Sequence, residues 1–279
     1  MKRNHRRVSL RRAALILLVP LPLTVLSRSE QPTAAATAAF DSYIQTVEAR
    51  LGRQHGSAAG FLAATDDARL RSGEAGVVID QVSADPARAL PGAMLHHWRG
   101  TAFVPGARAR DFECLMRDFA GYPKYFSPEV LTARVSSQDG GRYRVTMRVE
   151  QKHILTVVLD TSYNVSFGRL DAQHRYSISR STQITEIEHA GAKDERALTP
   201  AQNHGFLWRL NTYWSCAERD GGLHLQIETV SLTRAIPPGL GWAIGPFVES
   251  VPRESLEFTL RAVRNALRAE EASGTTHAR

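Results

Sequence analysis

Hydrophobic and polar residues alternate most regularly in residues 204–234, on both sides of the dipeptide Asp220-Gly221. Asp-Gly is typical of a two-residue type I′ turn, which needs positive φ at both central positions. If the dipeptide occupies those positions, the two flanking strands pair so that Trp214 lies opposite Ile227. The alternation therefore predicts a β-hairpin with a defined register.

The two faces of this hairpin differ in character. One face carries Trp208, Leu210, Thr212, Trp214, Cys216, Leu225 and Ile227. The other carries Arg209, Asn211, Tyr213, Ser215, His224, Gln226 and Glu228, and we expect it to face solvent. An antiparallel sheet divided in this way packs one face on a core, and the long apolar partner in this chain is its C-terminal helix.

The remaining pattern predicts a strand at residues 94–104, a helix within residues 107–121 and extended segments between residues 131 and 188. A long amphipathic helix is indicated near the C-terminus, with Pro252 near its first turn, by the helical spacing of Leu256, Leu260, Val263 and Leu267. The expected order is a strand, short helices, six strands including the hairpin, and one long helix.

A separate segment precedes this pattern. An amphipathic helix is predicted at residues 38–54 by the apolar residues Phe40, Tyr43, Ile44, Val47 and Leu51. We expect its apolar side to pack on the main domain, with docking on a membrane as the alternative. Residues 76–80 read as a short strand between loops.

The N-terminus holds the excess positive charge. Seven of the 35 Lys and Arg residues precede Glu30, the first acidic residue, and without residues 1–28 the chain has 28 basic and 28 acidic residues. A formally neutral body has no broad field that attracts nucleic-acid phosphates, so we expect no nucleic-acid partner. An apolar run at residues 13–26 and a small-residue stretch follow, which is the order of a secretory signal. The alternatives are an uncleaved membrane anchor and an ordinary cytosolic leader.

The main domain resembles the START-like, or SRPBCC, superfamily with its helix-grip fold, which includes polyketide cyclase/dehydrase and lipid-transport proteins. The resemblance rests on element order, on FAGYPKYFSPEV, on the WRLNTYW and DGG hairpin, and on the segment from IPPGLGW through the last helix. It implies an α+β fold in which a curved antiparallel sheet wraps around a long C-terminal helix, here with an N-terminal helical extension. It also implies a cavity for a hydrophobic molecule between sheet and helix.

These patterns divide the chain into four parts. Residues 1–35 form a signal or anchor with a linker, 36–92 the helical extension with a short strand, 93–271 the START-like domain, and 272–279 a disordered tail.

Candidate chemistry is sparse. Arg180 shares strand parity with apolar residues, so its guanidinium either forms a structural ion pair, anchors an anionic ligand group, or points outward at a bulge. His96 and His97 are adjacent on a strand and must point to opposite faces, so they do not form a shared metal site. Cys114 and Cys216 are expected to be separate buried thiols. Nucleophile-elbow, dinucleotide-binding and phosphate-loop motifs are absent from the sequence, so we assign no catalytic residue, no metal and no cofactor.

The sequence thus predicts a periplasmic or secreted monomer that holds a lipid or other hydrophobic small molecule and makes at most transient contact with a membrane. The predicted ligand-binding residues are Trp208, Leu210, Thr212, Trp214, Leu225, Ile227 and Arg180. Two alternatives stay open: a cyclase- or hydrolase-type enzyme that uses the same cavity, and a non-catalytic interaction domain whose cavity is filled by side chains.

Overall fold

The computed structural model describes residues 31–65, 70, 76–82, 88–90, 92–152, 156–236 and 241–276, and in the last range the side chains of residues 250–269. The segment expected to direct export, residues 1–28, lies outside the described residues.

One antiparallel sheet organises the described part of the chain, with ten strands of which eight follow the order β1-β3-β10-β9-β7-β6-β5-β4. The two short strands β2 and β8 pair with β3 and β7. The strands are β1 (Val77–Gln81), β2 (Arg88–Leu90), β3 (Ala93–Pro105), β4 (Val130–Asp139), β5 (Arg142–Lys152), β6 (Thr156–Arg169), β7 (His174–Glu188), β8 (Arg196–Ala197), β9 (Arg209–Arg219) and β10 (Gly222–Arg234).

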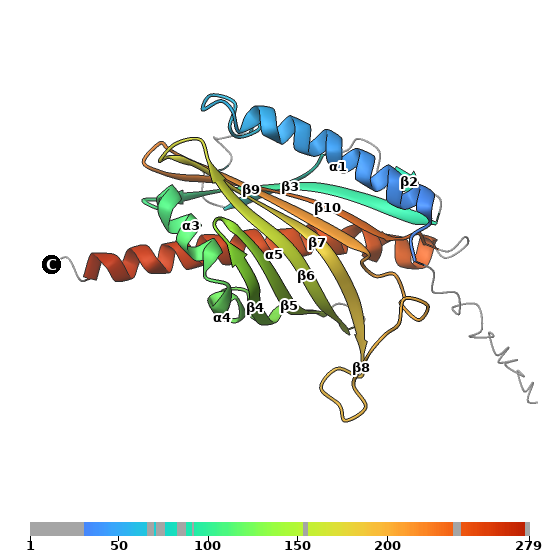
Figure 1. Ribbon diagram of the computed structural model, residues 1–279. Helices are drawn as coiled ribbons and strands as arrows, with labels where there is room; N and C mark the ends of the chain where they lie inside the picture. Colours follow the sequence, from blue (N-terminus) through green and yellow to red (C-terminus); the bar gives the residue numbers. More distant parts are fainter. Residues whose placement is uncertain are drawn as a thin grey trace, which may run out of the picture.

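Helices lie on both sides of this sheet (Figure 1). They are α1 (Ala34–Gln54), α3 (Ala109–Arg117), the 3₁₀ turn η2 (Phe119–Gly121), α4 (Tyr122–Tyr125) and α5 (Gly241–Thr276). None of the described helices combines the length and the apolar character needed to cross a membrane. This arrangement confirms the predicted fold, a curved antiparallel sheet that grips a long C-terminal helix.

The C-terminal helix begins earlier than its apolar spacing predicted. We expected Pro252 in the first turn, but α5 starts at Gly241 and contains Pro252 in its interior. A proline inside a helix costs about 3 kcal/mol, so the contacts of α5 with the sheet must outweigh that cost. The helix ends at Thr276, within the segment assigned to a tail.

The hairpin has the predicted register. Trp214 pairs with Ile227, and Arg219 pairs with Gly222 next to the turn. The φ angles of the two central residues are 57° at Asp220 and 74° at Gly221, as a type I′ turn requires.

The N-terminal extension packs on the sheet as expected. The side chain of Thr33 caps α1 by accepting a hydrogen bond from the backbone N–H of Ala36. The apolar side of the helix then joins β3, β9 and β10 in a second hydrophobic core, which contains Phe40, Ile44, Val47, Leu51, Leu95, Tyr213, Val230 and Leu232. We call the sheet face under α1 the outer face and the face against α5 the inner face.

The solvent-facing side that we predicted for the hairpin is therefore wrong. Tyr213 and Glu228, both expected on a wet surface, are each only 1% exposed. Strand alternation shows that two faces differ, but it cannot show what covers the more polar one.

Candidate ligand-binding site

The inner face of the sheet forms an apolar wall against α5. Trp214, Leu225 and Ile227 of the predicted site are buried there in one cluster with Leu260 and Val263 of the helix. A further group of apolar side chains is only partly buried at this cluster: Ile79, Trp98, Tyr125, Val130, Ala133, Met147, Phe167, Phe258, Ala262 and Ala266. Three of the seven predicted residues thus lie together in the place expected for a hydrophobic ligand.

Helix and sheet approach closely at Gly100 of β3. A Cβ atom added there would lie 3.0 Å from the Cδ2 atom of Leu260 and 3.1 Å from the Cγ2 atom of Ile227. The missing side chain therefore lets α5 rest on the centre of the sheet at this position.

One end of the wall carries a polar group that the sequence did not indicate. Gln151 Nε2 of β5 donates a hydrogen bond to Ser255 Oγ of α5 at 3.2 Å. Glu129, next to the first residue of β4, also contacts Ser255, and burial raises its pKa to about 7 although the hydrogen bond with Ser255 opposes the shift. Glu129 therefore exchanges its proton near neutral pH.

A second polar group on the inner face is the indole of Trp98. Its ring packs against the apolar cluster, and its Nε1 atom is buried without a hydrogen-bond partner among the described residues. An unsatisfied buried donor costs about 1–3 kcal/mol. This N–H is therefore available to an acceptor on a bound molecule.

His96 and His97 point to opposite faces, as predicted. His96 lies on the inner side, where its Nε2 atom is 3.1 Å from Thr233 Oγ1, and burial lowers its pKa to about 4. His97 lies on the outer side, where its Nε2 atom is 3.0 Å from Glu228 Oε2.

Thr212 and Leu210 continue the inner face of β9 away from Trp214. Both are only half-buried. Thr212 pairs with Thr229, and the backbone N–H of Leu210 donates to Ser181 Oγ at 2.9 Å. These positions therefore extend the wall toward a more open and more polar end of the sheet.

Trp208 does not lie on the inner face, contrary to our prediction. It precedes the first residue of β9, so the alternation of that strand does not determine its direction. Its backbone N–H donates to Leu232 O at 2.8 Å, and its ring packs against the second core beside α1.

Arg180 also lies on the outer face. Its Nε atom donates to Glu48 Oε1 of α1 at 2.6 Å, so of the three alternatives the structure contains the ion pair. Arg180 does share a face with Tyr176 and Ile178, but Ile178 packs in the core under α1. Strand parity predicts the inner face only when a sheet has one buried face, and this sheet is buried on both faces.

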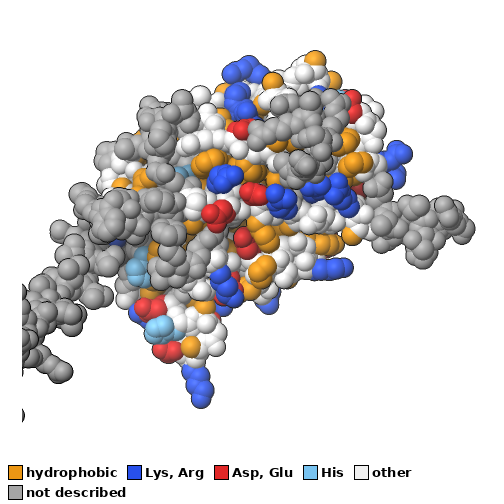
Figure 2. All heavy atoms as spheres, turned by 180° about the vertical axis from the view of Figure 1, so that it is seen from behind, with side chains coloured by type: hydrophobic (Ala, Val, Ile, Leu, Met, Phe, Trp, Pro, Cys, Tyr) orange, Lys and Arg blue, Asp and Glu red, His pale blue; other side chains and the backbone are white. Residues whose placement is uncertain are grey.

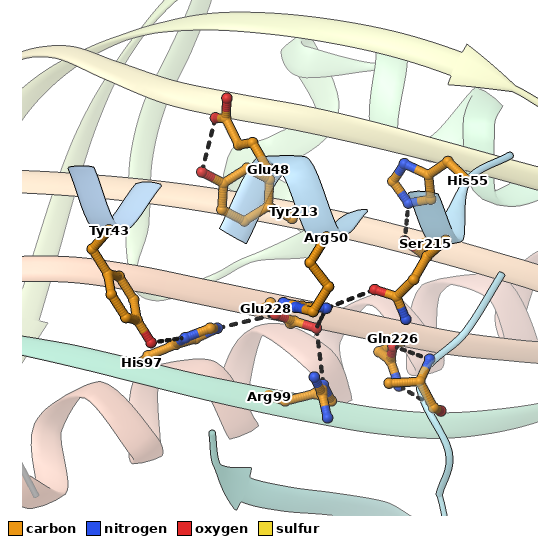
Figure 3. A network of polar contacts seen from close by, with 12 residues as sticks. Tyr43, Glu48, Arg50, His55, His97, Arg99, Tyr213, Ser215, Gln226 and Glu228 are labelled. Atoms are coloured by element: carbon orange, nitrogen blue, oxygen red, sulfur yellow. Dashed lines mark hydrogen bonds and ion pairs between the residues drawn. The ribbon is translucent and has the colours of Figure 1, made fainter. Parts of the chain in front are cut away.

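A network of polar groups around the buried Glu228 and His97 attaches α1 to the outer face (Figure 3). Both carboxylate oxygens of Glu228 contact Arg50 of α1, and Arg99 Nε donates to Glu228 Oε1 at 2.9 Å. His97 contacts the same carboxylate and also Tyr43 Oη, at 2.8 Å. We call Tyr43, Arg50, His97, Arg99 and Glu228 the α1 network.

The electrostatics of this network favour an ionised carboxylate. Burial alone would raise the pKa of Glu228, but the hydrogen bond with His97 and the charges of Arg99 and Arg50 outweigh it and lower the pKa to about 2. The groups satisfy one another, so this arrangement fits a structural attachment. The sequence contained one signal for it, namely the charged residues on the predicted helix at residues 38–54.

The two cysteines are free, and one differs from our expectation. Cys216 is buried, and burial raises the pKa of its thiol, whereas Cys114 is exposed on α3. We expected Cys114 in the core, but it lies on the side of α3 away from the buried residues Phe112 and Leu115.

The element order, the sheet and the central helix together decide the fold class. The chain has a helix-grip fold, in which a curved antiparallel sheet packs around a long C-terminal helix.

Comparison with known proteins found similar chains only among solved structures. No protein-family model matches the chain, and a search of curated proteins also found no match. Among solved structures, TTHA0849 from Thermus thermophilus is 16% identical with a TM-score of 0.44, and the alignment covers 62% of this chain and 97% of that protein. A STAR-related lipid transfer protein from Xanthomonas axonopodis is 16% identical with a TM-score of 0.42, covering 69% and 99%. The Zhui aromatase/cyclase from Streptomyces is 17% identical with a TM-score of 0.39, covering 62% and 94%.

The strand pairing and the packing of α5 on the sheet define the fold of this chain.

Proposed function

We propose that this chain is an exported, monomeric carrier that binds a lipid or another hydrophobic small molecule between the inner face of the sheet and α5. The observation that carries the proposal is the apolar wall around Trp214, Leu225 and Ile227, together with the N–H of Trp98, which has no hydrogen-bond partner among the described residues. A ligand with an apolar body and one hydrogen-bond acceptor would bury its apolar part against this wall and accept a hydrogen bond from the N–H of Trp98.

Export and membrane contact belong to the same proposal. The basic N-terminus, the apolar run and the small-residue stretch support export, and the formal neutrality of residues 29–279 argues against a nucleic-acid target. A carrier of apolar molecules would touch a membrane only while it loads or releases its cargo.

Native mass spectrometry and titration with a dansyl-labelled fatty acid test the proposed ligand class. We expect a retained apolar adduct on the purified protein and displacement of that adduct by the labelled fatty acid. Trp98→Phe removes one donor from the inner face and should weaken binding about 2- to 10-fold, as expected for one hydrogen bond.

Trp208→Phe is the matched control, because the Nε1 atom of Trp208 is also buried without a partner among the described residues but lies outside the inner face. The proposal fails if the protein carries no adduct and takes up no labelled fatty acid. In that case the interaction-domain alternative gains support, and Trp214→Ala should then cost about 3–5 kcal/mol, as in a filled core.

One observation favours an enzyme as the second candidate. A carboxyl group whose pKa lies near 7, such as Glu129, suits general acid–base catalysis at neutral pH, and Ser255, which Gln151 holds by a hydrogen bond, contacts it. Mass spectrometry of the adduct before and after incubation distinguishes the two candidates. A carrier returns its ligand with unchanged mass, whereas a product whose formation is lost in Glu129→Gln would support the enzyme.

A further inference from the structure

The outer face of the sheet is only partly covered by α1. The helix packs over β3, β9 and β10 and reaches β7 through the contact between Glu48 and Arg180. Beyond this contact, two open grooves of about 450 and 690 Å³ run over β4, β5, β6 and β7. This part of the outer face has no helix across it in the described part of the chain (Figure 1).

Arginines are concentrated in these grooves. Five arginines line them, against two aspartates, so the lining has an excess of three positive charges. We call Arg134, Arg142, Arg144, Arg148 and Arg180 the arginine face.

Strand register places several of these side chains close together. Arg144 pairs with Asn164, which pairs with Arg180, so these three residues form one row across β5, β6 and β7. Arg142 lies two residues from Arg144 on the same strand, about 7 Å away, and pairs with Ser166.

The five arginines differ in how far their charge is neutralised. Arg180 is bound to Glu48, and Arg148 is bound to Asp160 and to a second carboxylate. Arg134, Arg142 and Arg144 are exposed and have no ion pair among the described residues. A guanidinium group offers a planar set of donors that matches phosphate oxygens.

Two exposed apolar side chains lie on β4, the edge strand of the sheet. Leu131 and Val135 are 42% and 43% exposed, and Val135 pairs with Val145 of the inner cluster, so it belongs to the inner face and not to the arginine face. Where Figure 2 shows described residues on the side seen from behind, basic and acidic side chains are interspersed with hydrophobic ones.

We propose that the arginine face docks the protein on a bilayer that contains anionic phospholipids, whose phosphates contact Arg134, Arg142 and Arg144. This inference rests on the proposed function, because a carrier of apolar molecules has to meet a membrane. A bilayer fits better than a single soluble anion. The three free guanidinium groups are all exposed and spread along two strands, so one small anion would stay hydrated, whereas a bilayer presents many phosphates at once.

Sedimentation with vesicles tests the docking surface. We expect the full chain to bind vesicles of phosphatidylglycerol and phosphatidylcholine more tightly than vesicles of phosphatidylcholine alone, and less tightly at high salt. Each basic residue near an anionic surface contributes about fivefold, so the triple variant R134Q/R142Q/R144Q should lower partitioning on the order of a hundredfold.

The matched control removes three positive charges from α5 instead, in R253Q/R261Q/R268Q. Both variants keep the basic N-terminus, so its contribution is the same in each, and unchanged thermal unfolding shows that each is folded. An equal loss in the two variants, a loss in the control alone, or no preference for phosphatidylglycerol would overturn the proposal.

A titration with glycerophosphate separates the two sources of phosphate. Tight binding of glycerophosphate that is lost in the triple variant would show a site for soluble anions and would also refute bilayer docking. Uptake of the dansyl-labelled fatty acid from solution is measured on the same variants. Failure of vesicle binding with intact uptake contradicts only the docking surface, whereas failure of uptake contradicts the proposed function.

Discussion

The α1 network gives the sharpest prediction about stability, and its centre is Glu228. The side chain of Glu228 is 2% exposed and is shared by Arg50, Arg99 and His97. Glu228→Gln keeps the shape of the side chain but removes the charge that these three groups surround. The two arginines would then be held close together without the carboxylate that neutralises them.

The expected cost follows from the pKa of this carboxyl group. The surroundings lower the pKa of Glu228 from 4.5 to about 2, which corresponds to about 3 kcal/mol of stability. Removing one partner of a buried ion pair in other proteins costs a similar 3–5 kcal/mol. We therefore expect Glu228→Gln to lower the free energy of unfolding by about 3 kcal/mol at pH 7.

The pH dependence gives an independent check. A carboxyl group whose folded pKa lies below its unfolded value stabilises the protein above pH 4.5, and this contribution is lost as the pH falls toward 2. The difference between wild type and Glu228→Gln should therefore shrink across that range.

Urea denaturation followed by circular dichroism measures both effects. Glu257→Gln is the control, because Glu257 forms an exposed i,i+4 pair with Arg261 on α5 and should cost no more than about 0.5 kcal/mol. A loss below about 1 kcal/mol at pH 7 in Glu228→Gln, with an unchanged dependence on pH, would refute the reasoning.

The remaining predictions concern two buried histidines and one turn. Burial lowers the pKa of both His55 and His96 from 6.5 to about 4. Between these pH values the unfolded chain binds more protons than the folded chain, so the free energy of unfolding should fall as the pH falls from 6.5 to 4. Urea titrations at several pH values should show a weaker dependence of the free energy of unfolding on pH in the variant with both His55→Gln and His96→Gln. Replacing Asp220-Gly221 with Val-Val should lower the free energy of unfolding by about 2–4 kcal/mol, because β-branched residues resist positive φ. The conservative Asp220→Asn should be neutral, and wild-type thermal stability of the Val-Val variant would contradict the turn.

The turn chemistry and the spacing of apolar residues were sufficient to predict the hairpin and the two long helices. The turn at Asp220-Gly221 and the alternation around it determine the register of β9 and β10, because a shift by one residue would move Trp214 and Ile227 to the other face. The apolar spacing on α1 and on the second half of α5 predicted both helices, since the residues that contact a core recur with the helical period.

What covers each face was decided by the tertiary structure. The polar residues of the hairpin look like a solvated surface in the sequence, yet Glu228 is buried because Arg50, 178 positions away, supplies its counter-charge. No local pattern contains that pairing. The burial of both faces also explains the wrong side predicted for Arg180, because its parity with Ile178 was correct while the core that they share lies under α1.

In the candidate site, too, some residues could be predicted from the sequence and others were placed only by tertiary packing. Trp214, Leu225 and Ile227 could be assigned from the sequence, because each lies inside a regular strand with a determined register. Trp208 lies just outside β9, where the chain no longer follows strand alternation, and Glu129 meets Ser255 only through the packing of α5 on the sheet. The sequence by itself determined the strands, the helices and the inner apolar wall, whose periods repeat along the chain. Only the folded structure brought distant charges together, because ion pairs depend on distance in space and leave no period in the sequence.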